Sequence, residues 1–513
     1  MSTTSEKFQP MTGQQEGILL VSIMIVALCG IIYELIIGTV SSYLLGNSVY
    51  QFSLTIGFFM FAMGIGSLFS KYFSDQYVLN FIRVEIAIAL IGGICSLLLF
   101  MAFPMARAMY EFVMYSLILI IGSLVGMEIP ILTTLLAQRE TTKKSIANVM
   151  SLDYIGALIG SVSFPLLLLP SLGLVRSSFA IGLINILVAI INVVMFKDYL
   201  PNFKRMFYAC IAILALLVAF IFYGTWLTRY AEKHLYFDQI VYSTQTPYQK
   251  LVVTRSTTTR EQRLYIDGHI QFSSRDEYRY HENLIHPIMS LPGPRKNILI
   301  LGGGDGLAAR EILKYKDVEL IHLVDIDPEM IRLGRELPVL ERLNQGSMSD
   351  KKLTAYAEDA FTFINRPGIN YDRVIIDMPD PHNEAINKLY SREFYTMIKR
   401  RMNPDAVVVT QSSSPFFTPR TFWCIETTLN NVFKHTMSYH TSLPSFGIWG
   451  FNMARNDAKF PDKFHFDIPT RAITDDTMIA ALIFPKDMMR RTTPVNSIME
   501  PKLYQLYIED LQH

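Results

Sequence analysis

The distribution of apolar positions divides the chain into two halves of different character. Up to about residue 230, apolar runs of about 20 residues recur, and each is long enough to cross the hydrocarbon core of a bilayer. Beyond that point, short apolar runs alternate with polar segments, as in a soluble α/β domain. The pattern predicts seven membrane spans, near residues 17–38, 52–70, 84–103, 112–136, 154–174, 177–196 and 207–227.

The second half contains a glycine-rich turn between a predicted strand and a predicted helix. Residues 298–306, ILILGGGDG, lead from four apolar residues into the glycines, and residues 307–315 have helical periodicity. Glycine allows a tight turn and the close approach of a ligand. A second strand, 319–324, leads to Asp325, about 20 residues past the glycines, where such folds bind a ribose diol. NAD enzymes, methyltransferases and their relatives share this pattern.

Further strands are predicted on both sides of this turn. Residues 250–254 and 263–266 predict a small β-hairpin element before it, and the strands 353–357, 373–376 and 406–410 after it each end in polar residues. Open α/β sheets bind ligands at such carboxyl ends. We therefore predict a multi-span α-helical membrane domain followed by an α/β Rossmann-like, class I methyltransferase-like domain. The expected segments are a polar tail (1–16), the membrane domain (17–228), the β element (229–290) and the Rossmann-like domain with a C-terminal tail (291–513).

Composition supports this division. The 513 residues are 50% hydrophobic and only 18% charged, with a mean hydropathy of +0.27, which is too apolar for an ordinary soluble enzyme. The net charge of +1 gives no basic surface for nucleic acid. The four cysteines show no spacing typical of a disulfide framework or a zinc site: Cys29, Cys95, Cys210 and Cys424.

Four acidic residues lie within or beside the predicted spans. Glu34 and Glu128 are the deepest, and they either hold a cationic ligand or hydrogen bond between helices. Glu85 and Asp153 lie near span ends, where their carboxylates can reach the interface.

The basic residues predict an orientation. With seven spans, nine of them fall on one side and two, Arg107 and Arg176, on the other. The positive-inside rule then places the N-terminus in the cytoplasm and the C-terminal domain outside. The nine are Lys7, Lys71, Arg83, Arg139, Lys143, Lys144, Lys197, Lys204 and Arg205.

Acidic residues at strand ends are the candidate chemistry. Asp377 and Asp380 flank a proline, and two carboxylates there can hold a cationic amine and accept its proton, or they form a solvated turn. Asp305 and Asp325 belong to the same rim, which favours the functional interpretation. The segment from His281 to His286 is one residue too long for the HExxH zinc spacing, so a metalloprotease is excluded and no metal site is predicted.

Three motifs together resemble a known family. GGGDG at 302–306, DGHIQFSSRDEYRYHE at 267–282 and DMPDP at 377–381 are similar in order and approximate spacing to spermidine synthases, the polyamine aminopropyltransferases. The resemblance covers roughly 235–455. The membrane half resembles the multi-span region fused to such domains in some bacterial members. The resemblance implies a multi-pass protein of the bacterial cell membrane, in a homo-oligomer, that makes spermidine.

The implied reaction transfers an aminopropyl group from decarboxylated S-adenosylmethionine to an amine such as putrescine, giving spermidine and methylthioadenosine, with no further cofactor. By resemblance, the carboxylate of Asp377 is the base and Asp305 holds the donor's ammonium group. Donor binding is also implied for Gln249, Asp325, Asp359 and Ala360, and acceptor binding for Tyr280, His281 and Asp380. The sequence departs from the family at Asp325, usually glutamate, at Ala360, usually glycine, and at 443–447, where a tyrosine is common.

Two other functions remain open on these residues. A methyltransferase would use intact S-adenosylmethionine, although a carboxylate at Asp305 would repel the substrate's own carboxylate. A polyamine transporter or sensor would use Glu34 and Glu128, with the C-terminal fold as a binding domain. If the protein is an aminopropyltransferase, its donor is made in the cytoplasm, which favours a cytoplasmic catalytic domain. The positive-inside count with seven spans favours the opposite side.

Overall fold

The structure is a computed structural model that describes residues 11–45, 48–72, 76–103, 107–138, 141–236 and 238–512. The chain forms two compact units, Met1–Phe237 and Asp238–His513. Residues 1–10 of the predicted polar tail lie outside the described residues, as do two residues of the charge count, Lys7 and Arg139.

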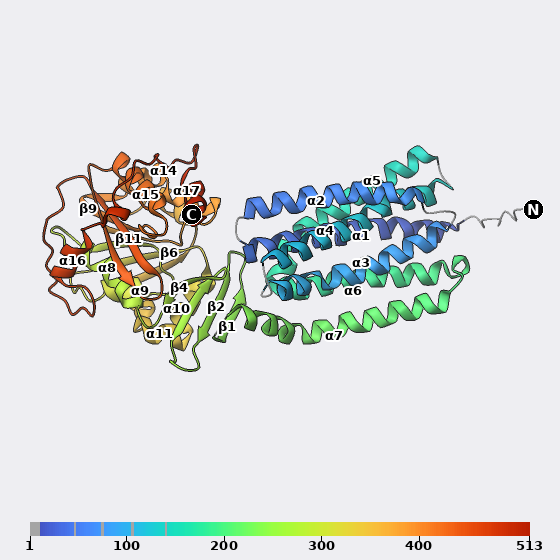
Figure 1. The fold of residues 1–513 in the computed structure, drawn as a ribbon, viewed down its shortest axis with the longest axis horizontal. Helices are drawn as coiled ribbons and strands as arrows, with labels where there is room; N and C mark the ends of the chain where they lie inside the picture. Colours follow the sequence, from blue (N-terminus) through green and yellow to red (C-terminus); the bar gives the residue numbers. More distant parts are fainter. Residues whose placement is uncertain are drawn as a thin grey trace, which may run out of the picture. The chain divides into compact units, whose positions relative to one another are not determined.

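The described part of the first unit consists of long helices packed side by side (Figure 1). Six helical stretches in the described residues are long and apolar enough to cross a membrane. One of them, Thr142–Met195, has 54 residues, and its helical backbone is interrupted at Gly173 (φ 70°, ψ −178°). All seven predicted spans fall on these stretches, because the fifth and sixth lie largely on opposite sides of Gly173. The helices are α1 (Gly13–Leu45), α2 (Ser48–Phe69), α3 (Tyr77–Ala102), α4 (Arg107–Ala137), α5 (Thr142–Ser163), α6 (Leu169–Met195) and α7 (Phe203–Leu235).

Glu85 lies in the interior of this unit. The prediction that its carboxylate reaches the interface is wrong, because the side chain is completely buried. The Glu85 and Glu128 carboxyl groups approach each other, and the Asn185 amide donates to the backbone carbonyl of Glu85 at 3.2 Å. Glu34 is also buried, whereas Asp153 is half-buried. Sequence position alone placed Glu85 near a span end, but helix α3 begins eight residues earlier, at Tyr77.

The second unit opens with an antiparallel sheet of four strands in the order β1-β2-β3-β4. Its apolar face, which includes Leu251, Val253 and Phe272, packs on the helices that follow the glycine turn. Strand β1 is absent from the sequence prediction because its residues alternate only weakly and none is fully buried. The strands are β1 (Gln239–Gln245), β2 (Lys250–Arg255), β3 (Gln262–Ile266) and β4 (His269–Ser273).

A seven-stranded sheet follows, with the order β10-β11-β9-β8-β5-β6-β7. Strands β5 to β9 pair in parallel, and β11 is antiparallel to both of its neighbours. This is the predicted Rossmann-like, methyltransferase-like arrangement; strands β10 and β11 were not predicted. The strands are β5 (Asn297–Gly302), β6 (Leu320–Asp325), β7 (Leu353–Ala357), β8 (Tyr371–Asp377), β9 (Met402–Gln411), β10 (His435–Leu443) and β11 (Gly447–Arg455).

Alternate residues of the central strands enter two separate cores. On β5, Ile298 and Ile300 face a core shared with helices α8 (Glu277–Ser290) and α9 (Leu307–Ile312). Leu299 and Leu301 face the other core, which helices α12, α14, α15 and α17 complete. Burial on both faces explains why the strands read as continuous apolar runs. These four helices are α12 (Ala360–Asn365), α14 (Arg392–Arg400), α15 (Pro419–Val432) and α17 (Leu503–Leu511).

The strand order reverses beside β5. The chain runs from β5 to β6 and β7 on one side, and then continues with β8 on the other, so that Gly302 pairs with Asp377. In open α/β sheets, ligands bind in the crevice outside the strand ends at such a reversal. The glycine turn and the DMPDP segment therefore meet at the position where a ligand is expected.

Gly302→Ala should be strongly destabilising. Gly302 has φ 87°, and an added Cβ would lie 2.0 Å from the Asp377 carbonyl oxygen. We expect a loss of about 2–5 kcal/mol from backbone strain and the clash together. Gly346→Ala is the matched control, because Gly346 also has a positive φ but an added Cβ meets no atom within 4 Å; its cost should be about 1–2 kcal/mol. Denaturant titration of full-length protein measures both, and equal losses would contradict the clash.

Candidate active site

A cavity of about 560 Å³ lies along the carboxyl ends of the parallel strands. It is lined by residues that end β5, β6, β8 and β9, together with residues of the small antiparallel sheet and of α8. The structure brings all nine sequence-predicted site residues to this cavity. They are Gln249, Tyr280, His281, Asp305, Asp325, Asp359, Ala360, Asp377 and Asp380.

The glycine turn holds the Asp325 carboxylate at the end of β6. Asp325 Oδ2 accepts from the Gly304 amide at 3.0 Å, and Oδ1 accepts from the Asp327 amide at 3.0 Å. An added Cβ on Gly304 would lie 2.6 Å from Asp325 Oδ2, so only glycine allows this approach. Each oxygen keeps a lone pair free, which suits the paired hydroxyls of a ribose. The Asp325 carboxylate is therefore held in a fixed position, although aspartate is shorter than the glutamate that is usual in the family.

Gln249 and Asp359 are fixed by neighbouring side chains at the cavity wall. The Gln249 amide donates to Asp327 Oδ2 at 2.9 Å. Asp359 caps α12 by accepting from the Thr362 amide at 2.9 Å, and its other oxygen pairs with Lys388 at 2.8 Å. Although burial opposes ionisation, Lys388 and the Thr362 amide hold the pKa of Asp359 below its usual range. Asp359 is therefore ionised at neutral pH.

The DMPDP segment is held rigidly against β9. Gln411, at the end of that strand, donates to the Met378 carbonyl and to the Tyr390 hydroxyl, both at 2.6 Å. Tyr390 in turn donates to the Pro379 carbonyl at 3.0 Å. The segment therefore has a fixed backbone, and both of its aspartates line the cavity, which favours the functional interpretation over a solvated turn.

The two aspartates of this segment have different partners. Tyr280 donates to Asp377 Oδ1 at 2.6 Å, a short bond that fixes the orientation of the carboxylate. Asp380 accepts long hydrogen bonds from Gln411 at 3.5 Å and from Tyr507 at 3.4 Å, and a further one from Ser413. A carboxylate has about four acceptor positions, so Asp380 can still accept a hydrogen bond from a ligand.

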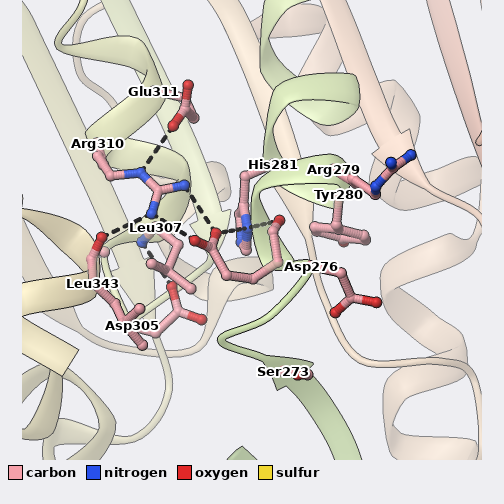
Figure 2. Close-up of polar contacts among 12 residues, drawn as sticks. Ser273, Asp276, Arg279, Tyr280, His281, Asp305, Leu307, Arg310, Glu311 and Leu343 are labelled. Carbon is pink, nitrogen blue, oxygen red and sulfur yellow. Dashed lines mark hydrogen bonds and ion pairs between the residues drawn. The ribbon is translucent and has the colours of Figure 1, made fainter. Parts of the chain in front are cut away.

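A buried ionic network lies behind His281 (Figure 2). The His281 Nδ1 atom contacts the Glu277 carbonyl at 2.8 Å and Glu277 Oε2 at 3.1 Å. Glu277 also pairs with both terminal nitrogens of Arg310, at 2.9 and 2.8 Å, and Arg310 Nε donates to Glu311 at 2.8 Å. Burial disfavours the charged imidazole, but the hydrogen bond and charge of Glu277 raise the pKa of His281 above its usual value. This network sets the orientation and charge of a cavity residue.

The cavity is rich in carboxylates whose ionisation burial opposes. Burial raises the pKa of Asp305, of Asp325 and of Asp380 to about 6 each. Burial also raises the pKa of Asp377, against the opposing effects of His281 and Tyr280. Asp305, Asp325 and Asp380 are therefore ionised above about pH 6, and together they make a site that attracts cations.

This titration predicts a pH dependence of ligand binding. Asp305, Asp325 and Asp380 lose their charge as the pH falls through about 6, whereas decarboxylated S-adenosylmethionine, the donor that the resemblance implies, keeps the charges of its ammonium and sulfonium groups. We expect its affinity to fall at least tenfold between pH 7.5 and pH 5, measured by calorimetry on full-length protein. Methylthioadenosine, which lacks both charges, is the control and should change much less. Equal losses for the two ligands would contradict the prediction.

Several lining residues were not predicted from the sequence. Leu443, Phe446 and Trp449 come from the β10–β11 hairpin and form an apolar wall, and Tyr507 comes from the last helix. The hairpin follows helix α15, and its apolar residues stand among polar ones, so they carried a weak signal in the sequence. Tyr507 carried none, because no local motif connects a C-terminal helix to a strand end. The cavity thus has an acidic floor and a partly aromatic wall.

These features define a Rossmann-like domain with an acidic cavity at the carboxyl ends of its parallel strands. The spermine/spermidine synthase domain profile matches residues 277–463. The polyamine aminopropyltransferase of Leptospira interrogans is 40% identical over 492 residues, with 95% of this chain and 97% of that protein covered. Polyamine aminopropyltransferase 1 of Streptomyces coelicolor is 41% identical over 507 residues, with 96% and 94% covered. The chain belongs to the polyamine aminopropyltransferase family, and the likeness extends through both units.

Among solved structures, a spermidine synthase in complex with the transition state analogue AdoDATO aligns with 48% of this chain and 86% of its own, at 24% identity and a TM-score of 0.45.

Proposed function

We propose that the protein transfers the aminopropyl group of decarboxylated S-adenosylmethionine to putrescine, giving spermidine and methylthioadenosine. The observation that carries the proposal is the position of Asp305, half-buried in the glycine turn and lining the same cavity as Asp377 and Asp380. A carboxylate there attracts the donor's ammonium and repels the carboxylate of intact S-adenosylmethionine. Removal of that carboxylate from the donor relieves the repulsion.

The proposed chemistry is an in-line displacement at carbon. The acceptor nitrogen forms a bond to the aminopropyl carbon, while the carbon–sulfur bond breaks and its electron pair neutralises the sulfonium. The acceptor amine has an unperturbed pKa near that of lysine, about 10.4, so it enters as an ammonium ion and must lose a proton. Asp377 orients the amine and takes that proton, while Asp380 holds the acceptor. A sulfonium leaves as a neutral thioether and needs neither an acid nor a metal.

Donor preference tests the proposal against the methyltransferase alternative. Purified full-length protein is given putrescine with either decarboxylated or intact S-adenosylmethionine, and the products are identified by mass spectrometry. The proposal predicts spermidine and methylthioadenosine from the decarboxylated donor, and no methylated amine from the intact one. Methyl transfer from intact S-adenosylmethionine would overturn the proposal.

We further propose that the first unit spans the cell membrane and that the C-terminal unit is cytoplasmic. The length and apolar character of its helices support the first statement, and the cytoplasmic origin of the donor supports the second. Seven crossings with the observed basic residues favour the opposite side. A reporter fused after His513 tests the orientation: activity of a cytoplasmic reporter is expected, and activity of a periplasmic one would contradict it.

A second candidate function, polyamine transport or sensing, is favoured by one feature of the first unit. Among its described residues, both carboxylate oxygens of Glu85, one of Glu128 and the Tyr33 hydroxyl are buried without a hydrogen-bond partner. Buried acids in membrane helices often mark the site of an ion or a substrate. The sequence suggested Glu34 and Glu128 for this role, whereas the structure places Glu85 beside Glu128. The residues to test are therefore Glu85 and Glu128. Glu85→Gln and Glu128→Gln should reduce polyamine flux if this function is present, and unchanged flux would exclude it.

A further inference from the structure

The C-terminal helix α17 is firmly docked on the catalytic unit. Asp510 accepts hydrogen bonds from the backbone amide and the hydroxyl of Thr421, both at 3.0 Å, and pairs with Arg420 at 2.8 Å. These contacts place a carboxylate at the N-terminus of α15, where the helix dipole favours it. Leu503, the first residue of α17, is completely buried in the core beneath the large sheet. The helix is therefore part of the folded unit.

The segment before α17 is tied to the same residues that support the DMPDP segment. The Asn496 amide donates to the Tyr390 carbonyl at 3.1 Å, and its oxygen accepts from the Leu503 amide at 3.2 Å. Asn496 is completely buried. Because Tyr390 also holds the Pro379 carbonyl, α17 and the catalytic aspartates share one support.

This docking directs Tyr507 into the active-site cavity. Tyr507 is 9% exposed, lines the cavity and donates its hydroxyl hydrogen to Asp380 Oδ2 at 3.4 Å. The other side-chain hydrogen bonds to the Asp380 carboxylate come from Gln411, at 3.5 Å, and from Ser413. The hydroxyl of Tyr507 can therefore orient this carboxylate without occupying its remaining lone pairs.

We propose that Tyr507 is a specificity-determining residue of the amine-acceptor site. Its hydroxyl positions Asp380 for the acceptor's ammonium group, and its ring limits the length of amine that the cavity admits. This inference rests on the proposed aminopropyl transfer. It assigns part of the acceptor site to helix α17, three residues before Asp510, whose contacts dock this helix.

The test uses Tyr507→Phe, with Tyr504→Phe as the matched control. Tyr504 lies on the same helix but does not line the cavity, so its variant removes a hydroxyl without touching the acceptor site. For Tyr507→Phe we expect the KM for putrescine to rise about tenfold or more, as for loss of a hydrogen bond to a charged group. The KM for the donor should stay within about twofold of wild type. Calorimetric binding of the donor shows that each variant is folded.

A second variant tests the role of the ring. Tyr507→Ala should increase the kcat/KM for cadaverine and spermidine relative to putrescine, because the cavity is longer without the phenol ring. The inference is overturned if Tyr507→Phe behaves like Tyr504→Phe, or if its defect lies in the KM for the donor. Wild-type protein that releases no methylthioadenosine with any amine would instead overturn the proposed function, and this inference with it.

Discussion

Asp377→Asn is expected to lower methylthioadenosine release at least a hundredfold, the usual contribution of a positioned proton acceptor. The asparagine oxygen can still accept the hydrogen bond from Tyr280, so the geometry of the turn should survive and the affinity for the donor should change little. The loss should therefore appear in kcat. Single-turnover assays on full-length protein measure it directly.

Asp317→Asn is the control for this substitution. Asp317 lies on the surface of the same unit, half exposed, and pairs only with Arg295 among the described ion pairs. Its replacement removes an aspartate without touching the cavity, and activity should stay within about twofold of wild type. A loss of less than tenfold for Asp377→Asn would show that another group takes the proton.

Arg310→Met is expected to lower the free energy of unfolding by about 3–5 kcal/mol, the usual effect of removing one partner of a buried ionic network. Arg310 lies between Glu277 and Glu311, and all three side chains are buried. Without the guanidinium, Glu277 loses its bidentate partner, whereas Glu311 keeps Lys314 and His286. Chemical denaturation of the full-length protein measures the change.

Arg332→Met is the matched control for Arg310→Met. Arg332 also pairs with two glutamates, Glu329 and Glu336, but its side chain is 46% exposed. Exposed pairs contribute about 0–1 kcal/mol, so this variant should be almost as stable as wild type. Equal losses for the two variants would show that burial does not determine the effect.

The sequence predicted those parts of the site that local patterns specify. A glycine turn after an apolar strand predicts where β5 ends, and the acids that follow β6 and β8 then meet at the same edge because parallel strands end there. Asp305, Asp325, Asp377 and Asp380 all line the cavity for this reason. Their roles in the reaction remain proposals.

The sequence could not reveal contacts between residues far apart in the chain. Arg310 and Glu277 are separated by 33 positions, and Tyr507 and Asp380 by 127. Strand β1 has no fully buried residue, so its periodicity was too weak to predict it. In the first unit, hydropathy located the helices but not the depth of Glu85, because burial depends on which helices pack around a side chain.

The most direct test is amine-dependent release of methylthioadenosine by purified full-length protein supplied with decarboxylated S-adenosylmethionine. Putrescine, cadaverine and spermidine are offered separately. We predict release that depends on the amine and is fastest with putrescine, since Asp377 and Asp380 are proposed to hold a short diamine. No release with any of the three amines would contradict aminopropyl transfer and would direct attention to the buried acids of the first unit.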